Sequence, residues 1–286
     1  MGSSLFVCTT VSAVSFALLL AQPASAEPVK ARFVEAELVT EVHAIKAGEP
    51  FWAGLRLAMD PDWHTYWMNP GDSGLPTSID WDLPEGFSAG AIKWPYPQRF
   101  EHPPYISYGY EDEVLLIAEI TPPAGLPDGA SLSLSARADW TVCREDLCMP
   151  GGADLTLDVS TTDEEPTLDR YWKAYFEKTR ARLPHAIEDW QVVASADDKT
   201  LRLTLTPGAA RDPGTIMILE TSKDTLDHDK PVSMSRDGDA IALEVALDER
   251  GGGAPEQFSA VLLASRHWDD SGRVKALQVS VPVTRR

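Results

Sequence analysis

Two cysteines, Cys143 and Cys148, are the residues of this sequence best suited to chemistry, and four residues separate them. The third cysteine of the 286-residue chain, Cys8, lies in a segment that we expect to be cleaved, so the pair has no other sulfur to bond. A disulfide that closes so short a loop adds only about 2 kcal/mol of stability on the chain-entropy estimate, which makes it a weak staple. A reversible dithiol–disulfide pair and a local structural disulfide both remain open, because thiol reactivity depends on surroundings that a sequence does not show.

The first 26 residues have the pattern of a secretory signal peptide. Residues 5–20 form a mostly apolar run that is short for a membrane span, and Ala24-Ser25-Ala26 fits a cleavage site. No Lys or Arg precedes the apolar run, which leaves an uncleaved membrane anchor as the alternative. Export would place the cysteine pair in an oxidising compartment, where a disulfide persists.

Composition limits the classes of partner. The formal net charge is −19, and the first 26 residues contain no charged side chain. So acidic a protein is a poor ligand for nucleic acid or for an anionic membrane surface. The hydrophobic content of 43% suffices for a packed core. A mature chain of about 260 residues allows one large domain or two ordinary ones.

The cysteine pair lies between two segments that alternate in polarity. From Ser131 to Val142 every second residue is apolar, and Asp154 to Val159 alternates again. Period-two alternation predicts strands with one buried face, so the pair is expected at the tip of a β-hairpin. If the alternation continues by one residue, Cys143 leaves the core face and points outward.

The rest of the chain predicts an all-β fold of two β-sandwiches joined by an amphipathic helix. Short alternating runs separated by Pro and Gly turns are typical of sandwiches. Mostly apolar and aromatic residues recur at helical spacing before Pro184, namely Leu168, Tyr171, Trp172, Tyr175, Phe176, Thr179 and Leu183. The predicted boundaries are a signal peptide at 1–26, a first domain at 27–162, a linker helix at 163–184 and a second domain at 185–286.

Residues 60–110 are rich in proline and tryptophan, and long irregular segments of this kind often bind ligands or cover sites. Within them, Gly71-Asp-Ser-Gly74 looks like the nucleophile motif of a serine protease. We reject that function, because His64 lies only nine residues before Ser73 and the segment favours a turn.

A soft Cu(I) site is a second hypothesis, in which Met149 and His102 join the two cysteines. The spacing is not that of a zinc knuckle, and there is no second cysteine pair. The other histidines, His43, His185, His228 and His267, are scattered and are expected mostly on the surface. A non-enzymatic scaffold that binds a partner through the aromatic segment is a third hypothesis.

Several spaced segments of the first predicted domain carry a family resemblance. They are Trp63-His-Thr-Tyr-Trp67, Asn69-Pro-Gly-Asp-Ser-Gly-Leu-Pro76, Trp94-Pro-Tyr-Pro-Gln-Arg-Phe100, Tyr108-Gly-Tyr-Glu111, and Trp140-Thr-Val-Cys143 with Cys148-Met-Pro150. Residues 30–160 resemble the periplasmic N-terminal domain of the DsbD family of thiol:disulfide interchange proteins. The closer match is the ScsB-like branch, which is associated with suppression of copper sensitivity. Residues 185–286 resemble the second sandwich of that branch only weakly.

The resemblance implies a periplasmic, immunoglobulin-like sandwich without an organic cofactor. Its cysteine pair, matched here by Cys143 and Cys148, would accept electrons from a membrane-embedded partner and pass them to thioredoxin-like proteins. The chain carries neither the membrane domain nor the thioredoxin-like domain of that family, so we expect a standalone carrier, a split subunit or a descendant with a new partner. An aromatic cap loop shields the pair in the family. The candidate here is 94–110, with Tyr96, Phe100, Tyr105, Tyr108 and Tyr110 as candidate cap residues.

Overall fold

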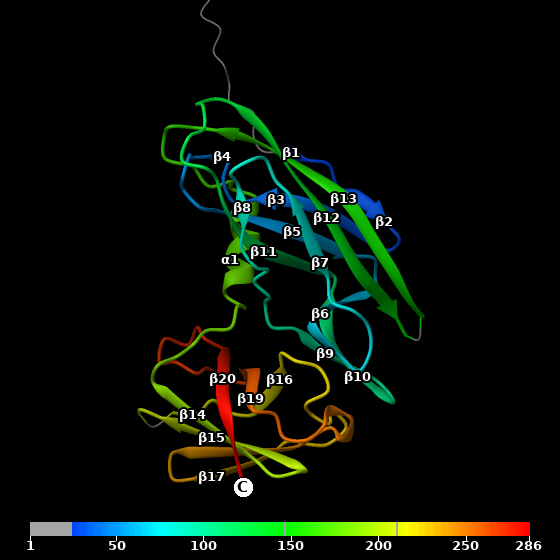
Figure 1. The fold of residues 1–286 in the computed structure, drawn as a ribbon, viewed down its shortest axis with the longest axis vertical. Helices are drawn as coiled ribbons and strands as arrows, with labels where there is room; N and C mark the ends of the chain where they lie inside the picture. Colours follow the sequence, from blue (N-terminus) through cyan, green and yellow to red (C-terminus); the bar gives the residue numbers. More distant parts are fainter. Residues whose placement is uncertain (1–24, 146, 210) are drawn as a thin grey trace, which may run out of the picture.

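The computed structural model describes residues 25–145, 147–209 and 211–286, and the predicted all-β fold of two sandwiches is confirmed. In Figure 1 the first sandwich lies above the second, and the helix α1 lies against the first. The predicted signal peptide falls outside the described residues except for Ser25 and Ala26, which pair with Asp158 and Leu157. No helix in the described ranges is long and apolar enough to cross a bilayer.

Within the described residues, the first sandwich packs an eight-stranded sheet against a five-stranded sheet. The larger sheet contains β1 (Ser25–Ala26), β4 (Ala44–Ile45), β6 (His64–Gly71), β7 (Ser78–Asp82), β9 (Gln98–His102), β10 (Tyr105–Glu111), β12 (Ser131–Arg144) and β13 (Leu147–Thr161). The smaller sheet contains β2 (Val29–Ala31), β3 (Val34–Thr40), β5 (Phe51–Met59), β8 (Ser88–Ala89) and β11 (Glu113–Thr121). Five strands, β6 to β10, thus lie in residues 60–110, which the proline content suggested would be mostly loop.

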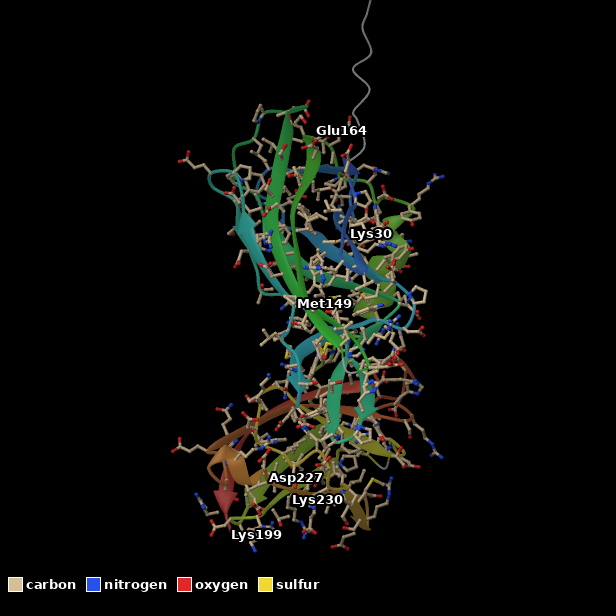
Figure 2. All side chains as sticks on the ribbon, turned by 90° about the vertical axis from the view of Figure 1, so that its right-hand side faces the viewer. Lys30, Met149, Glu164, Lys199, Asp227 and Lys230 are labelled. Carbon is tan, nitrogen blue, oxygen red and sulfur yellow. A yellow bond between two sulfur atoms is a disulfide. The ribbon has the colours of Figure 1, made fainter. Side chains whose placement is uncertain are left out.

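The hairpin of β12 and β13 is the longest feature of the larger sheet, and the prediction of a hairpin is confirmed. Its antiparallel register runs from Ser131 opposite Ser160 to Arg144 opposite Leu147. The predicted apolar face is directed into the core, where Leu134, Ala138 and Val142 are fully buried. In Figure 2, Met149 near the hairpin tip lies towards the middle of the long axis, between Glu164 and Asp227. The tip of the hairpin therefore lies at the end of the first sandwich that faces the second.

The second sandwich follows one continuous order of strands, β16-β19-β20-β14-β15-β18-β17, in the described ranges. These are β14 (Trp190–Ala196), β15 (Thr200–Pro207), β16 (Ile216–Glu220), β17 (Ser233–Asp237), β18 (Ala240–Ala246), β19 (Gln257–Ala264) and β20 (Ala276–Arg285), with a 3-10 helix at Glu249–Gly251. The first part of β20 pairs with β19 and its last residues pair in parallel with β14, so β20 joins the two layers. Strand β17 was not predicted, because all five of its residues are exposed and lack an apolar face.

The α-helix α1 (Trp172–Arg180) lies on the outer face of the smaller sheet of the first sandwich. Phe176 is fully buried and clusters with Val39, Leu115 and Ile117. The Thr179 hydroxyl donates to the Leu115 carbonyl over 3.2 Å. The predicted aromatic stripe is only partly buried, since Tyr171 is 61% exposed. The helix thus packs as part of the first sandwich rather than as a free linker.

Replacing Phe176 tests this packing. Because Phe176→Ala leaves a cavity under α1, we expect a loss of about 3–5 kcal/mol in the unfolding free energy of the first sandwich. Tyr171→Ala, an aromatic truncation at an exposed position beside the helix, should change it by less than about 0.5 kcal/mol. Urea unfolding followed by tryptophan fluorescence measures both, and equal effects would contradict the packing described.

Candidate functional site at a cross-strand disulfide

Cys143 and Cys148 form a disulfide across the tip of the β12–β13 hairpin. The two residues are directly opposite each other in the register, and their Cα atoms are 4.1 Å apart. The bond therefore joins neighbouring strands that the sheet already holds together. The bond therefore adds little conformational restraint to the chain. A chemical role explains this disulfide better than a structural one.

The two sulfur-bearing residues differ in accessibility. Cys143 is only 1% exposed, whereas Cys148 and its neighbour Leu147 are exposed. The prediction that Cys143 points to solvent was wrong. It assumed that one face of β12 is open, but β6 pairs with the tip of β12 and places His64 opposite Cys143. An incoming reagent therefore meets Cys148 first.

Tyr66 on β6 is the side chain that contacts both sulfurs. Its hydroxyl donates to the Cys143 Sγ over 2.8 Å and lies 3.6 Å from the Cys148 Sγ. Burial raises the pKa of Tyr66, and a hydrogen bond with Ser73 offsets only part of this effect. The hydroxyl thus keeps its proton and can stabilise negative charge on Cys143 if the disulfide opens.

His64 lies two residues before Tyr66 on the same strand. Its ring stacks on Phe100 of β9 at a centroid distance of 4.5 Å, and the ring of His102 lies 6.0 Å away. Burial, assisted by the charge of His102, lowers the pKa of His64 to about 4. A neutral imidazole and an aromatic ring therefore lie beside the buried cysteine.

Family comparison agrees with this geometry. Residues 30–160, which hold the disulfide, Tyr66 and His64, match the family described as "Thiol:disulfide interchange protein DsbD, N-terminal". The first sandwich is a DsbD N-terminal domain. No curated protein sequence matches the chain.

Two solved structures align over more of the chain than the DsbD N-terminal match does. The crystal structure of the N-terminal periplasmic domain of ScsB from Proteus mirabilis aligns with a TM-score of 0.62 at 17% identity, covering 87% of this chain and 94% of that chain. The likeness reaches beyond the first sandwich and concerns the fold. The periplasmic chaperone SfaE aligns over 87% of this chain and all of that chain with a TM-score of 0.20 at 8% identity, too low to support an argument.

The five candidate cap residues of the DsbD N-terminal domain occupy different environments. Phe100 is buried on His64 beside the cysteine pair. Tyr105 is 55% exposed on the β9–β10 hairpin. The other three make contacts elsewhere: Tyr96 with Arg182, Tyr108 with His228, and Tyr110 with the Pro95 carbonyl. Of the five candidates, Phe100 is thus the one that contacts a residue of the site, His64.

The Gly71-Asp-Ser-Gly74 segment of the domain forms a turn at the end of β6, as predicted. A Cβ atom on Gly74 would lie 2.3 Å from the Cζ atom of Tyr66, so only glycine lets the turn close on that ring. Ser73 bonds to Tyr66 and not to a catalytic histidine in this arrangement. The segment supports the tyrosine that contacts the disulfide.

The candidate copper ligands lie near the site, since Met149 follows Cys148 and the His102 ring is 6.0 Å from the His64 ring. Among the described residues, no group of three or more His, Cys, Asp or Glu side chains is arranged to hold a metal ion. The two sulfurs are bonded to each other, and Met149 lies opposite Val142 in the sheet. Among the side chains of this site, sequence reasoning missed Tyr66. The segment Trp63-His-Thr-Tyr-Trp67, which contains Tyr66, was part of the family resemblance. The period of two along a strand, which places His64 and Tyr66 on one face, could have indicated its role.

The buried histidine predicts an acid-sensitive first sandwich. The pKa of His64 is lowered in the folded state, so the unfolded chain binds more protons between about pH 6.5 and 4, and stability falls as the pH decreases through this range. His64→Gln should flatten the dependence of the unfolding midpoint on pH in that window. His43→Gln, at a side chain that is 41% exposed, is the matched control. An unchanged acid response in His64→Gln would refute the assignment.

Proposed function

We propose that this protein is a periplasmic thiol:disulfide interchange module. In this proposal Cys143 and Cys148 carry electrons from a membrane reductant to thioredoxin-like proteins. The observation that carries the proposal is a disulfide with one exposed sulfur-bearing residue, Cys148, and one buried sulfur that accepts a hydrogen bond from Tyr66. The match to the DsbD N-terminal family supports the same chemistry.

The exchange begins at the accessible sulfur. A thiolate of the reduced donor attacks the Cys148 Sγ, a donor–Cys148 bond forms, and the Cys143–Cys148 bond breaks. Cys143 leaves with the electron pair as a thiolate, to which the Tyr66 hydroxyl donates. This hydrogen bond is charge-assisted once the sulfur is negative, and it lowers the energy of the leaving group.

The second half of the reaction releases the donor. The donor's other thiolate attacks its own sulfur in the mixed disulfide, so the donor becomes a disulfide and Cys148 leaves as a thiolate. Two protons from the donor thiols, passed through water, complete the Cys143 and Cys148 thiols. The reverse sequence, again through Cys148, reduces a thioredoxin-like acceptor.

Trapping tests which cysteine reacts with a partner. Cys143→Ser leaves only the exposed cysteine. Its partner is a thioredoxin-like protein whose resolving cysteine is replaced by serine and whose remaining cysteine is first converted to its mixed disulfide with thionitrobenzoate. The Cys148 thiolate should attack that partner sulfur, release thionitrobenzoate and accumulate a protein–protein mixed disulfide. Cys148→Ser should accumulate much less, because Cys143 is buried. Non-reducing electrophoresis with mass spectrometry identifies the bond, and the double Ser variant is the blank. Equal trapping by both variants would contradict the proposed order of attack.

Tyr66→Phe tests the hydrogen bond to sulfur. Without the Tyr66 hydroxyl, the Cys143 thiolate of the reduced protein loses a hydrogen bond, so the reduced state becomes less stable. The reduction potential should become more negative by about 30–60 mV, which corresponds to the free energy of a hydrogen bond to a charged group. Equilibration with dithiothreitol buffers measures the potential. Tyr171→Phe, on an exposed side chain near α1, should keep the wild-type value. A wild-type potential below about −300 mV would instead mark the bond as structural and count against the function.

A further inference from the structure

Strand β6 connects the disulfide to the second sandwich. Its first residue, His64, pairs with Cys143, and Tyr66 bonds the sulfur. Near its end, the Asn69 Nδ2 donates to the carbonyls of Glu220 and Ser222 over 3.0 and 3.1 Å. Asn69 is only 1% exposed, so this crossing is a buried contact between the sandwiches. The same short strand therefore serves the redox site and the domain junction.

The turn that follows β6 bears directly on Tyr66. Gly74 packs against the tyrosine ring, and Ser73 bonds to its hydroxyl. Asp72, between β6 and these residues, is anchored in the first sandwich because its Oδ2 accepts from the Ile106 amide over 2.8 Å. A displacement of this turn would change the position of the Tyr66 hydroxyl relative to the sulfurs.

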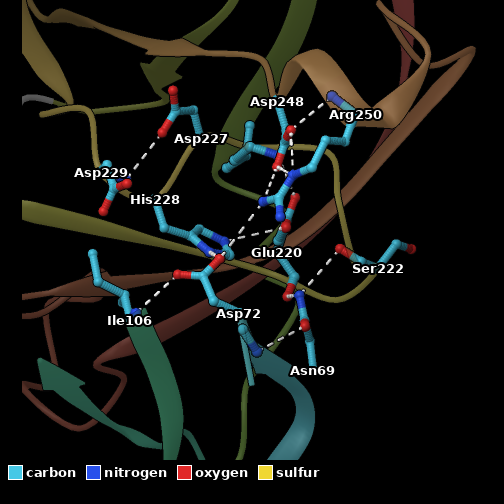
Figure 3. Close-up of polar contacts among 12 residues, drawn as sticks. Asn69, Asp72, Ile106, Glu220, Ser222, Asp227, His228, Asp229, Asp248 and Arg250 are labelled. Atoms are coloured by element: carbon cyan, nitrogen blue, oxygen red, sulfur yellow. Dashed lines mark hydrogen bonds and ion pairs between the residues drawn. The ribbon is translucent and has the colours of Figure 1, made fainter. Parts of the chain in front are cut away.

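The second sandwich holds this turn at two points, of which Figure 3 shows the first. The His228 ring lies between two carboxylates: its Nδ1 is 3.3 Å from the Asp72 Oδ1, and its Nε2 is 3.3 Å from the Glu220 Oε1. Lys223 donates to the Gly74 carbonyl over 3.4 Å. The two neighbours of Ser73, Asp72 and Gly74, thus both contact residues of the second sandwich.

The His228 contact is buried and charged. The side chains of His228 and Glu220 are 8% and 1% exposed, which corrects the expectation that such a histidine lies on the surface. Burial alone would lower the pKa of His228, but Glu220 and Asp72 outweigh it and the pKa is raised. The ring of Tyr108 packs edge-on against His228, and Arg250 lies 3.9 Å from Asp72. Removing one partner of a buried charged contact leaves the others uncompensated, so this junction has a preferred arrangement.

We propose that the second sandwich tunes the disulfide of the first by holding the Gly71–Gly74 turn against Tyr66. Asp72 and His228 are positioning residues in this arrangement, and Tyr66 is the group that touches sulfur. The inference rests on the proposed exchange function and gives the second sandwich a role in it. When the His228 contact is lost, the turn relaxes, the Tyr66 hydroxyl donates less well to Cys143, and the dithiol state loses stability relative to the disulfide.

His228→Gln in the full chain tests the proposal, because it changes nothing within the first sandwich. The equilibrium between the protein disulfide and reduced glutathione should shift towards the protein disulfide, by a factor on the order of fivefold. This factor is smaller than the one expected for losing a whole hydrogen bond to a charged group. The pKa of the Cys143 thiol in a Cys148→Ser background should rise in parallel. His267→Gln makes the same change on a loop that bonds within the second sandwich, and it should keep the wild-type constant.

A double-mutant cycle with Tyr66→Phe identifies the route. The effect of His228→Gln should disappear in the Tyr66→Phe background, because the group through which it acts is gone. If His228→Gln does not fold, Asp72→Asn and Lys223→Ala weaken the same junction and carry the same expectation. A folded junction variant with the wild-type constant, or one whose shift persists without the Tyr66 hydroxyl, overturns the inference. Failure of the wild-type pair to exchange with glutathione would remove the proposed function itself.

Discussion

The register of the β12–β13 hairpin is the constraint on which the site depends. The pairing continues from the base of the hairpin to Cys143 opposite Cys148 without a shift. Side chains on a strand alternate between faces, so a slip of one residue would move the buried apolar face to solvent and separate the two sulfurs. The apolar residues along β12 therefore fix the register of the hairpin, and the register places the two cysteines opposite each other at its tip.

The hairpin alone does not make the two sulfurs different. That asymmetry comes from β6, which covers Cys143 and leaves Cys148 open, and from Tyr66, which bonds Cys143 more closely than Cys148. A disulfide between equally exposed residues would offer a partner two equivalent points of attack. In the proposed exchange, the difference in burial separates an entry sulfur from a leaving sulfur, and one strand with its following turn supplies that difference.

Local patterns in the sequence predicted the hairpin, most strands and the helix, because alternation and helical spacing are properties of neighbouring residues. The burial of Cys143 was not predictable in this way, since it results from pairing with His64, far away in the chain. The same reason applies to His228, whose partner Asp72 belongs to the other sandwich. Strand β17 escaped detection for a different reason: Ser233–Asp237 forms an exposed edge and has no apolar residues that repeat. The contacts that determine reactivity are thus the long-range ones.

The unequal burial of the two cysteines also bears on oxidative damage. When the pair is reduced, a peroxide would reach Cys148 and convert it to a sulfenic acid, while Cys143 stays covered. The adjacent Cys143 thiol then condenses with that sulfenic acid, releases water and restores the disulfide before a second oxidant molecule can form the irreversible sulfinic acid. An exchange module of the proposed kind would thus return from accidental oxidation to a normal state of its cycle.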